Sequence, residues 1–222
     1  MNSIPFTIEQ FLNVFQRYNV AVWPAQVLLY AVGLITIGLA LQRRVNLSRS
    51  INFVLAFLWL WMGIVYHLLF FSSINEAAYA LGAFFILQAF VFVFVGVKAK
   101  LVFRFKPDAY GITGAIFFLY ALVAYPVFGY LVGHHYPIAP TFGLPCPTTI
   151  FTFGMLLWAD RRVPVFVLIL PLIWSLIGFW AAVALTITED FGLLLAGLIG
   201  SLLIIYRNFK RGVAQEVPRA SA

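Results

Sequence analysis

The chain has 222 residues, of which 64% are hydrophobic and only 9% are charged. Because soluble domains carry about 25% charged residues, this composition excludes an ordinary soluble domain and predicts a chain whose solvent is lipid. The net charge of +7 comes from basic clusters at the ends of apolar runs, so it predicts membrane topology and not nucleic-acid binding. The sequence lacks the alternating pattern of a transmembrane barrel, which leaves helices.

Residues 1–19 predict a short amphipathic helix at the membrane interface. Thr7 and Gln10 fit a capping box at its start. Apolar residues then recur on one helical face, at Ile8, Phe11, Leu12 and Phe15. The segment has no basic n-region and carries Glu9, so we expect it to stay on the protein and lie flat on the bilayer instead of being cleaved as a signal peptide.

Seven apolar runs follow, and most approach the roughly 20 residues that a helix needs to cross about 30 Å of hydrocarbon. They are residues 20–41, 51–71, 77–97, 110–133, 141–159, 163–186 and 191–206. The sequence therefore predicts an all-α, polytopic membrane helix bundle of about seven transmembrane helices over residues 20–211. The polar residues 212–222 predict a disordered cytoplasmic tail.

Basic residues predict how the bundle is oriented. They follow the first, third, fifth and seventh runs, at residues 43–49, 98–106, 161–162 and 207–211, whereas Arg17 is the one exception. The positive-inside rule assigns these clusters to the cytoplasm. An odd number of crossings then leaves the N-terminus outside and the C-terminus in the cytoplasm, and the predicted location is a cell inner membrane.

All three histidines and the single cysteine lie toward the predicted outer side. They are His67, His134, His135 and Cys146, and Glu76 adds a carboxylate nearby. Imidazole and thiolate together suit a soft or borderline metal ion, so these five residues are the candidate metal ligands and such an ion is the candidate cofactor. The alternative is that the histidines only bond headgroups, water or loop carbonyls, because their spacing matches no specific metal motif.

Residues 140–149 contain three prolines within eight positions and cannot form one regular helix. One interpretation is that this stretch folds back into the outer half of the bundle and builds a solute site. The other is an extended external loop, with Pro147 in the first turn of the next helix and the threonines bonding their own backbone. The candidate solute or ion pathway comprises His67, Gln88, Cys146, Thr148, Thr149 and Thr152.

Two features limit the pathway hypothesis. Gln88 lies near the middle of the third run, where an amide more often joins two helices than lines a path. Glu189 and Asp190 fall in a predicted outer loop, so no acidic residue is expected at hydrocarbon depth. Any proton coupling would then have to use His67, because a relay of buried carboxylates is not predicted.

Three stretches of the chain resemble a family of small bacterial multi-pass membrane proteins of unknown function. They read FLNVFQRYNVAVWPAQ, WMGIVYHLLFFSSIN and FGLPCPTTIFTFG. The likeness covers most of the chain and implies a bacterial inner-membrane protein. It also implies that the His67 segment and the segment from Pro145 to Pro147 belong to one family pattern, but it carries over no activity.

The leading functional hypothesis is a transporter, channel or sensor-like binder for a small solute or ion, including a metal ion, with an outward-facing site. A membrane-embedded metal-dependent hydrolase ranks lower because the histidines form no recognisable triad, and no other catalytic motif favours an enzyme. A structural or assembly subunit of a membrane complex is the third hypothesis. Small residues Ala196, Gly197, Gly200 and Ser201 would suit the close helix contact of such a complex or of a homo-oligomer.

Overall fold

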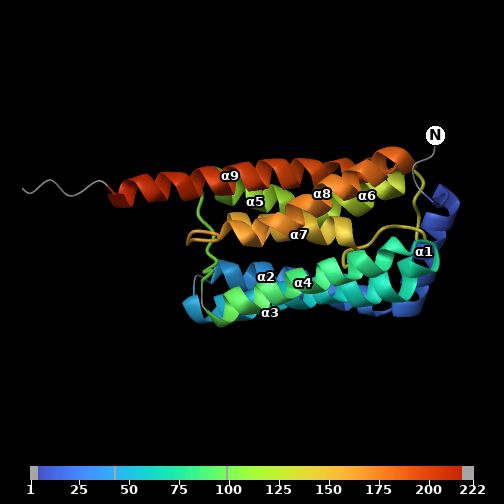
Figure 1. The fold of residues 1–222 in the computed structure, drawn as a ribbon, viewed down its shortest axis with the longest axis horizontal. Coiled ribbons are helices and arrows are strands. Elements are labelled where there is room, and N and C mark those ends of the chain that lie inside the picture. The colour runs from blue at the N-terminus through green and yellow to red at the C-terminus, as the bar shows by residue number, and fades with distance from the viewer. Residues whose placement is uncertain (1–4, 43, 99, 217–222) are drawn as a thin grey trace, which may run out of the picture.

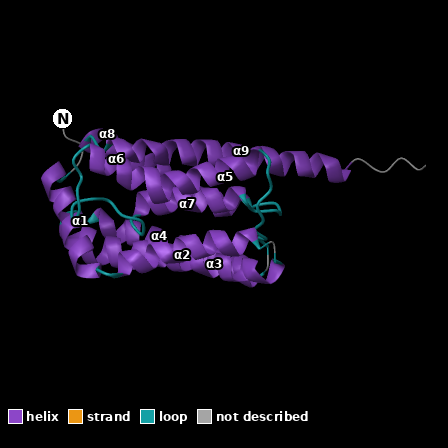
Figure 2. Ribbon diagram, turned by 180° about the vertical axis from the view of Figure 1, so that it is seen from behind, coloured by secondary structure: helices purple, strands orange, loops and turns teal. Residues whose placement is uncertain are grey.

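The computed structural model describes residues 5–42, 44–98 and 100–216, which form an elongated bundle of helices (Figure 1). The α-helices are α1 Ile8–Val22, α2 Ala25–Leu41, α3 Val45–Trp61, α4 Ala77–Val97, α5 Ala109–Leu119, α6 Tyr125–Leu131, α7 Pro145–Leu157, α8 Val165–Leu185 and α9 Phe191–Glu216. The described residues form no β-strand beyond isolated bridges (Figure 2). The all-α prediction is therefore confirmed.

Shorter helical stretches connect several of these helices. The π-helix η1, Met62–Phe70, continues α3, and the π-helix η3, Tyr120–Ala124, joins α5 to α6. The 3-10 turns η2, Phe71–Ser73, and η4, Thr188–Asp190, follow η1 and precede α9. Single π-helical turns are rare and often occur at functional sites, and both π stretches here lead to the same end of the bundle.

Long apolar helices dominate the described part of the chain. Five stretches are long and apolar enough to cross a bilayer: Asn46–Ser73, Ala77–Val97, Ala109–Leu131, Val165–Leu185 and Thr188–Arg211. A sixth is counted if α1 and α2, which meet at a bend of 86°, are taken as one span. These helices are those of a membrane bundle, and the sharp bend lays α1 across one end of it (Figure 1).

The fifth predicted run departs most from the structure. Residues 141–144 are not helical, and α7 begins only at Pro145, so its 13 residues are fewer than a lone span of the hydrocarbon needs. Nearly every residue of α7 is buried, because α5, α8 and α9 pack around it. A helix enclosed by protein does not have to match the bilayer thickness. At the other end of the chain, α9 continues past the predicted tail boundary to Glu216, and residues 217–222 lie outside the described residues.

The interior of the bundle is filled by aromatic side chains from both halves of the chain. Trp59 of α3 stacks on Phe85 of α4 with ring centroids 4.8 Å apart. The Trp59 indole N–H donates a hydrogen bond of 3.1 Å to the Thr152 hydroxyl of α7. Phe151 and Phe153, both on α7, are fully buried beside them. These contacts join the layer of α2, α3 and α4 to the group formed by α5 to α9.

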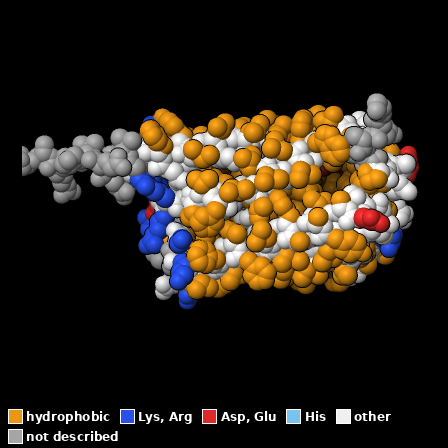
Figure 3. All heavy atoms as spheres, viewed as in Figure 1, with side chains coloured by type: hydrophobic (Ala, Val, Ile, Leu, Met, Phe, Trp, Pro, Cys, Tyr) orange, Lys and Arg blue, Asp and Glu red, His pale blue; other side chains and the backbone are white. Residues whose placement is uncertain are grey.

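Charged residues separate to the two ends of the molecule. Apolar side chains cover the flank, and most of the visible Lys and Arg gather at the end where α9 leaves the bundle, where a red side chain is also visible (Figure 3). Acidic side chains lie at the α1 end, together with a basic one (Figure 3). We call these the basic end and the α1 end. The apolar flank includes Leu28, Leu69 and Leu202, each more than 60% exposed, as expected for surfaces that face lipid.

One asparagine fixes the α1 end. α1 starts at the capping box formed by Thr7 and Gln10, as predicted. Near its other end, the fully buried Asn19 donates hydrogen bonds of 2.7 Å to the backbone carbonyls of both Pro137 and Ala139. These bonds hold the loop between α6 and α7 against α1.

Candidate functional site

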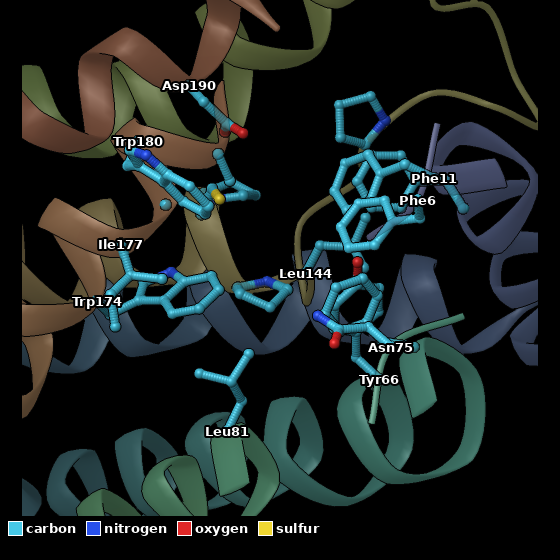
Figure 4. Close-up of a pocket in the computed structure, with 18 of the residues that line it drawn as sticks. Phe6, Phe11, Tyr66, Asn75, Leu81, Leu144, Trp174, Ile177, Trp180 and Asp190 are labelled. Atoms are coloured by element: carbon cyan, nitrogen blue, oxygen red, sulfur yellow. The ribbon is translucent and has the colours of Figure 1, made fainter. Parts of the chain in front are cut away.

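A cavity of about 110 Å³ lies at the α1 end of the bundle (Figure 4). Its walls come from the segment around α1, from η1, η2 and α4, from the loop before α7 and the first turn of α7, and from α6, α8 and η4. Segments far apart in the sequence thus converge here. Protein ligand sites are concave and mainly apolar with a few convergent polar groups, and this cavity fits that description.

Aromatic rings form most of the cavity wall. Phe6, Phe11 and Tyr66 lie on one side, whereas Trp174 and Trp180 of α8 lie opposite (Figure 4). The rings support one another: the centroids of Phe6 and Phe11 are 5.8 Å apart, and the two rings are stacked. Trp180 is half exposed, so the cavity reaches the surface of the molecule.

One acidic side chain, Asp190, enters this apolar cavity. It is only 5% exposed, and its carboxyl points toward the cavity (Figure 4). The Tyr125 hydroxyl donates a hydrogen bond to Oδ1 of Asp190, and the Cys146 thiol is a second hydrogen-bonding neighbour of the same carboxyl. Cys146 and Tyr125 also line the cavity. The site therefore combines aromatic walls with one carboxyl held by two donors.

The neighbouring residue, Glu189, completes a buried acidic pair. Glu189 is 1% exposed, and its Oε1 lies 2.6 Å from Nδ1 of His134. Its backbone carbonyl accepts a hydrogen bond of 2.7 Å from the Tyr120 hydroxyl. Both residues lie in the connection between α8 and α9, where the sequence predicts a loop, but their side chains are buried.

The chain geometry before α9 explains why the acidic pair is buried. Thr186 ends α8 in the left-handed region at φ 59°, and the Ile187 N–H then bonds the Ala182 carbonyl at 2.9 Å. The turn brings η4 back toward the bundle and presents Glu189 and Asp190 to α6. In the sequence, Thr188, Glu189 and Asp190 have the polar character of a loop. Nothing in the neighbouring sequence indicates that Glu189 contacts His134 or that Asp190 contacts Tyr125, because each partner is more than 50 positions away.

His67 of the predicted pathway lies beside the cavity without lining it. Its ring stacks on Phe85 at 4.5 Å and meets Trp174 edge-on at 5.6 Å. Nδ1 lies 2.8 Å from the Met62 carbonyl, which accepts a hydrogen bond if Nδ1 carries the proton. Nε2 is buried with no hydrogen-bond partner among the described residues.

The other predicted pathway residues are packed within helix contacts, apart from Cys146. Gln88 donates a hydrogen bond of 3.1 Å to the Val167 carbonyl, which joins α4 to α8 and confirms the interhelical interpretation. Thr152 donates to the Thr148 carbonyl at 2.8 Å, as a threonine bonding its own helix does. Thr148, Thr149 and Thr152 are fully buried and do not line the cavity.

The five candidate metal ligands do not converge. His134 pairs with Glu189, His135 packs edge-on against Tyr130 with centroids 4.4 Å apart, and Glu76 is exposed. Cys146 neighbours Asp190, whereas His67 is enclosed by rings. Within the described residues, no three His, Cys, Asp or Glu side chains are grouped to hold a metal ion. The predicted grouping at one site is therefore corrected, because these side chains have different neighbours and do not meet.

Comparison with known proteins gives a family but no activity. The family model of DUF6064, described as a family of unknown function, matches residues 8–215. No curated protein matches the chain, and no solved structure matches it. The match covers all of the described bundle except its first few residues and Glu216, and it brings no activity with it. The function must therefore be argued from the geometry of the chain itself.

Proposed function

The chain belongs to the DUF6064 family, and from its geometry we propose that it is a multi-pass membrane transporter for a small solute, with a binding cavity that faces the outer side. The observation that carries this proposal is the cavity at the α1 end, which is open there and lined by residues from eight or more separate segments. Transporters bind solutes near helix interfaces where broken or irregular helices meet, and the two π-helices and the short α7 meet here.

The interior below the cavity supports access from one side. Trp59, Phe85 and Phe151 are fully buried in one continuous core, and Gln88 is bonded to the backbone of α8. A solute in the cavity would have to pass this packed layer to reach the basic end. Such a layer favours a transporter that alternates between two states over a channel with a continuous pore.

The orientation rests on the charge separation between the two ends. The basic end carries Arg104, Lys106, Arg207 and Arg211, and the positive-inside rule assigns that end to the cytoplasm. The α1 end then faces outside, α1 lies at the outer interface, and the seven helices α2 to α9, with α5 and α6 as one, form the crossings. A bacterial inner membrane is the location that this orientation and the resemblance favour.

The single cysteine provides a direct test, because Cys146 lines the cavity. A membrane-impermeant thiol reagent added to right-side-out vesicles should modify Cys146, and the same reagent added to inside-out vesicles should modify it more slowly, through the inward-open state. Cys146→Ser is the control for labelling of other groups. Ala181→Phe, which places a ring in the cavity, should slow the reaction at least tenfold.

Two results would count against the proposal. Failure of the reagent to reach Cys146 from the outer face would mean that the cavity is closed or faces the cytoplasm. Reaction from the outer face with none from the inner face would leave a solute-binding protein that does not transport.

A further inference from the structure

We infer that the solute is a small organic cation, an ammonium group carried on a compact apolar body. This inference rests on the proposed solute binding in the cavity at the α1 end and names the chemical class of the solute. Two independent features carry it: the aromatic faces of the cavity wall and the lack of a counter-charge, among the described residues, for the acidic side chain that lines it, Asp190.

The wall of the cavity suits a weakly hydrated cation. Phe11 and Phe15 of α1, Tyr66 of η1, and Trp174 and Trp180 of α8 border the same space. The negative face of an aromatic ring attracts an ammonium group that lies within about 6 Å of its centre, and several rings around one space form the cage that recognises quaternary ammonium groups. The same rings contact the apolar body of the ligand, so both parts of such a molecule are accommodated.

The charge balance favours a positive ligand. Of the two buried acidic residues, Glu189 is paired with His134, whereas no Lys, Arg or His of the described chain forms an ion pair with Asp190. The neighbours of Asp190 are a phenol and a thiol, which donate hydrogen bonds but bring no positive charge. Asp190 therefore lacks a counter-charge in the cavity, and a buried carboxylate without one is costly.

Other ligand classes fit these side chains less well. An anion would meet the Asp190 carboxyl, and no basic side chain of the described residues lines the cavity to bind it. A purely apolar solute would contact the rings but leave Asp190 unpaired. A metal ion would find only Asp190 and Cys146 as strong ligands, and the described residues group no third one with them. Of these classes, only an organic cation both contacts the aromatic faces favourably and supplies a counter-charge to the Asp190 carboxyl.

The test uses two probes of nearly identical shape, choline and the neutral 3,3-dimethylbutan-1-ol. N-ethylmaleimide, which is uncharged, reports access to Cys146, and each probe is titrated as a protectant of the purified protein in lipid nanodiscs. We expect choline to slow the modification of Cys146 at concentrations at least tenfold lower than the neutral alcohol does. An isosteric pair isolates the charge, because the apolar contacts of the two probes are the same.

Asp190→Asn removes the charge and keeps the shape of the side chain. In this variant the protection by choline should weaken at least tenfold, whereas protection by the neutral alcohol should change less than twofold. Glu76→Gln, which neutralises an exposed carboxylate at the same end, is the matched control and should leave both unchanged. If Asp190→Asn does not fold, the ratio of the two probes in the unaltered protein decides the question.

The outcomes separate this inference from the function on which it rests. Equal protection by choline and the neutral alcohol would overturn the cationic class while leaving solute binding in the cavity intact. A Cys146 that N-ethylmaleimide cannot modify would overturn the open cavity itself, and the proposed function with it.

Discussion

The two ends of this bundle differ in how their buried polar groups are arranged. At the α1 end, helices diverge around a cavity, and two carboxyl groups are buried beside it. At the basic end, side chains of α9 fill the space between the loops: Arg207 donates hydrogen bonds of 2.6 Å to the Leu157 carbonyl and 3.1 Å to the Leu156 carbonyl. One end contains the cavity of about 110 Å³, whereas at the other end a basic side chain bonds the carbonyls that end α7.

The basic end is closed by a network around Asp160. Its carboxylate forms ion pairs with Lys106 and, at 3.8 Å, with Arg104, and its backbone carbonyl accepts a hydrogen bond of 2.6 Å from Arg211. Asn208 bonds both the N–H and the carbonyl of Val163. The comparison shows that the carboxylate at the basic end is paired with basic side chains, whereas the Asp190 carboxyl at the α1 end has hydrogen-bond donors but no ion-pair partner among the described residues.

The largest effect on stability should come from Arg207→Ala. Arg207 is 5% exposed, and its loss leaves two carbonyls at the C-terminus of α7 without their charged donor. We expect a loss of about 3 kcal/mol in the free energy of unfolding, since hydrogen bonds to charged groups contribute about 1.5–3 kcal/mol each. Denaturation of the purified protein measures this loss. Lys210→Ala changes an exposed neighbour on α9 and should leave the free energy of unfolding nearly unchanged.

Asn19→Ala removes the hydrogen bonds that hold the loop between α6 and α7 against α1 at the α1 end. It removes the donor to Pro137 and Ala139 and the acceptor of the 3.1 Å bond from Thr141. We expect about 2 kcal/mol of destabilisation, together with faster modification of Cys146 as the loop before α7 loosens. Gln16→Ala on the exposed side of α1 is the control. Loss of stability without a change in Cys146 reactivity would show that the loop does not border access to the cavity.

Two buried threonines of α7, in the packed layer between the two ends, can be compared directly: the Thr152 hydroxyl accepts a hydrogen bond, and the Thr149 hydroxyl has none within the described part of the chain. Thr152→Val removes the acceptor for the buried Trp59 indole and should destabilise the protein by about 1–2 kcal/mol. The Thr149 hydroxyl is buried and has no partner among the described residues, so Thr149→Val should be neutral or stabilising. Thermal unfolding of the two variants side by side checks the contrast, and equal losses would contradict the assigned hydrogen bond.

The smallest effect concerns pH at the basic end. The hydrogen bond from Lys106 and the nearby Arg104 hold the pKa of Asp160 below its ordinary value. A lowered folded-state pKa means that the stabilisation is complete above the unfolded pKa, about 3.9, and is lost as pH falls through the folded value. Because Asp160 is partly exposed, the contribution should stay below about 1 kcal/mol. Asp160→Asn should therefore cost stability at pH 7, and the difference from the unaltered protein should shrink below about pH 4.

The fold was largely predictable from the sequence, because the length of an apolar run and the basic residues at its end can be read for each helix without knowing its neighbours. The runs at residues 77–97 and 163–186 match α4 and α8 closely. The shortened α7 was not predictable, since its length depends on being enclosed by neighbours. The three prolines indicated the irregular stretch before it. In the structure Leu144 is buried, and Pro147 lies in the first turn of α7.

The candidate site was less predictable because it depends on contacts between distant segments. Cys146 was identified from its residue type and lines the cavity. Asp190 was missed, because its burial is set by the turn after Thr186 and by Tyr125 from α6. Residue chemistry could identify which side chains are reactive, but only the three-dimensional packing determines which of them meet.

The reactivity of Cys146 tests at once whether the cavity at the α1 end is open to the outer side and whether it prefers positive charge. Two methanethiosulfonate reagents of similar size, one with a trimethylammonium group and one with a sulfonate, should be added to the outer face of right-side-out vesicles. After correction for their rates with a free thiol, we predict at least tenfold faster modification by the cationic reagent, and a reduced preference in Asp190→Asn. Equal rates for the two reagents, or a preference for the anionic one, would contradict the account.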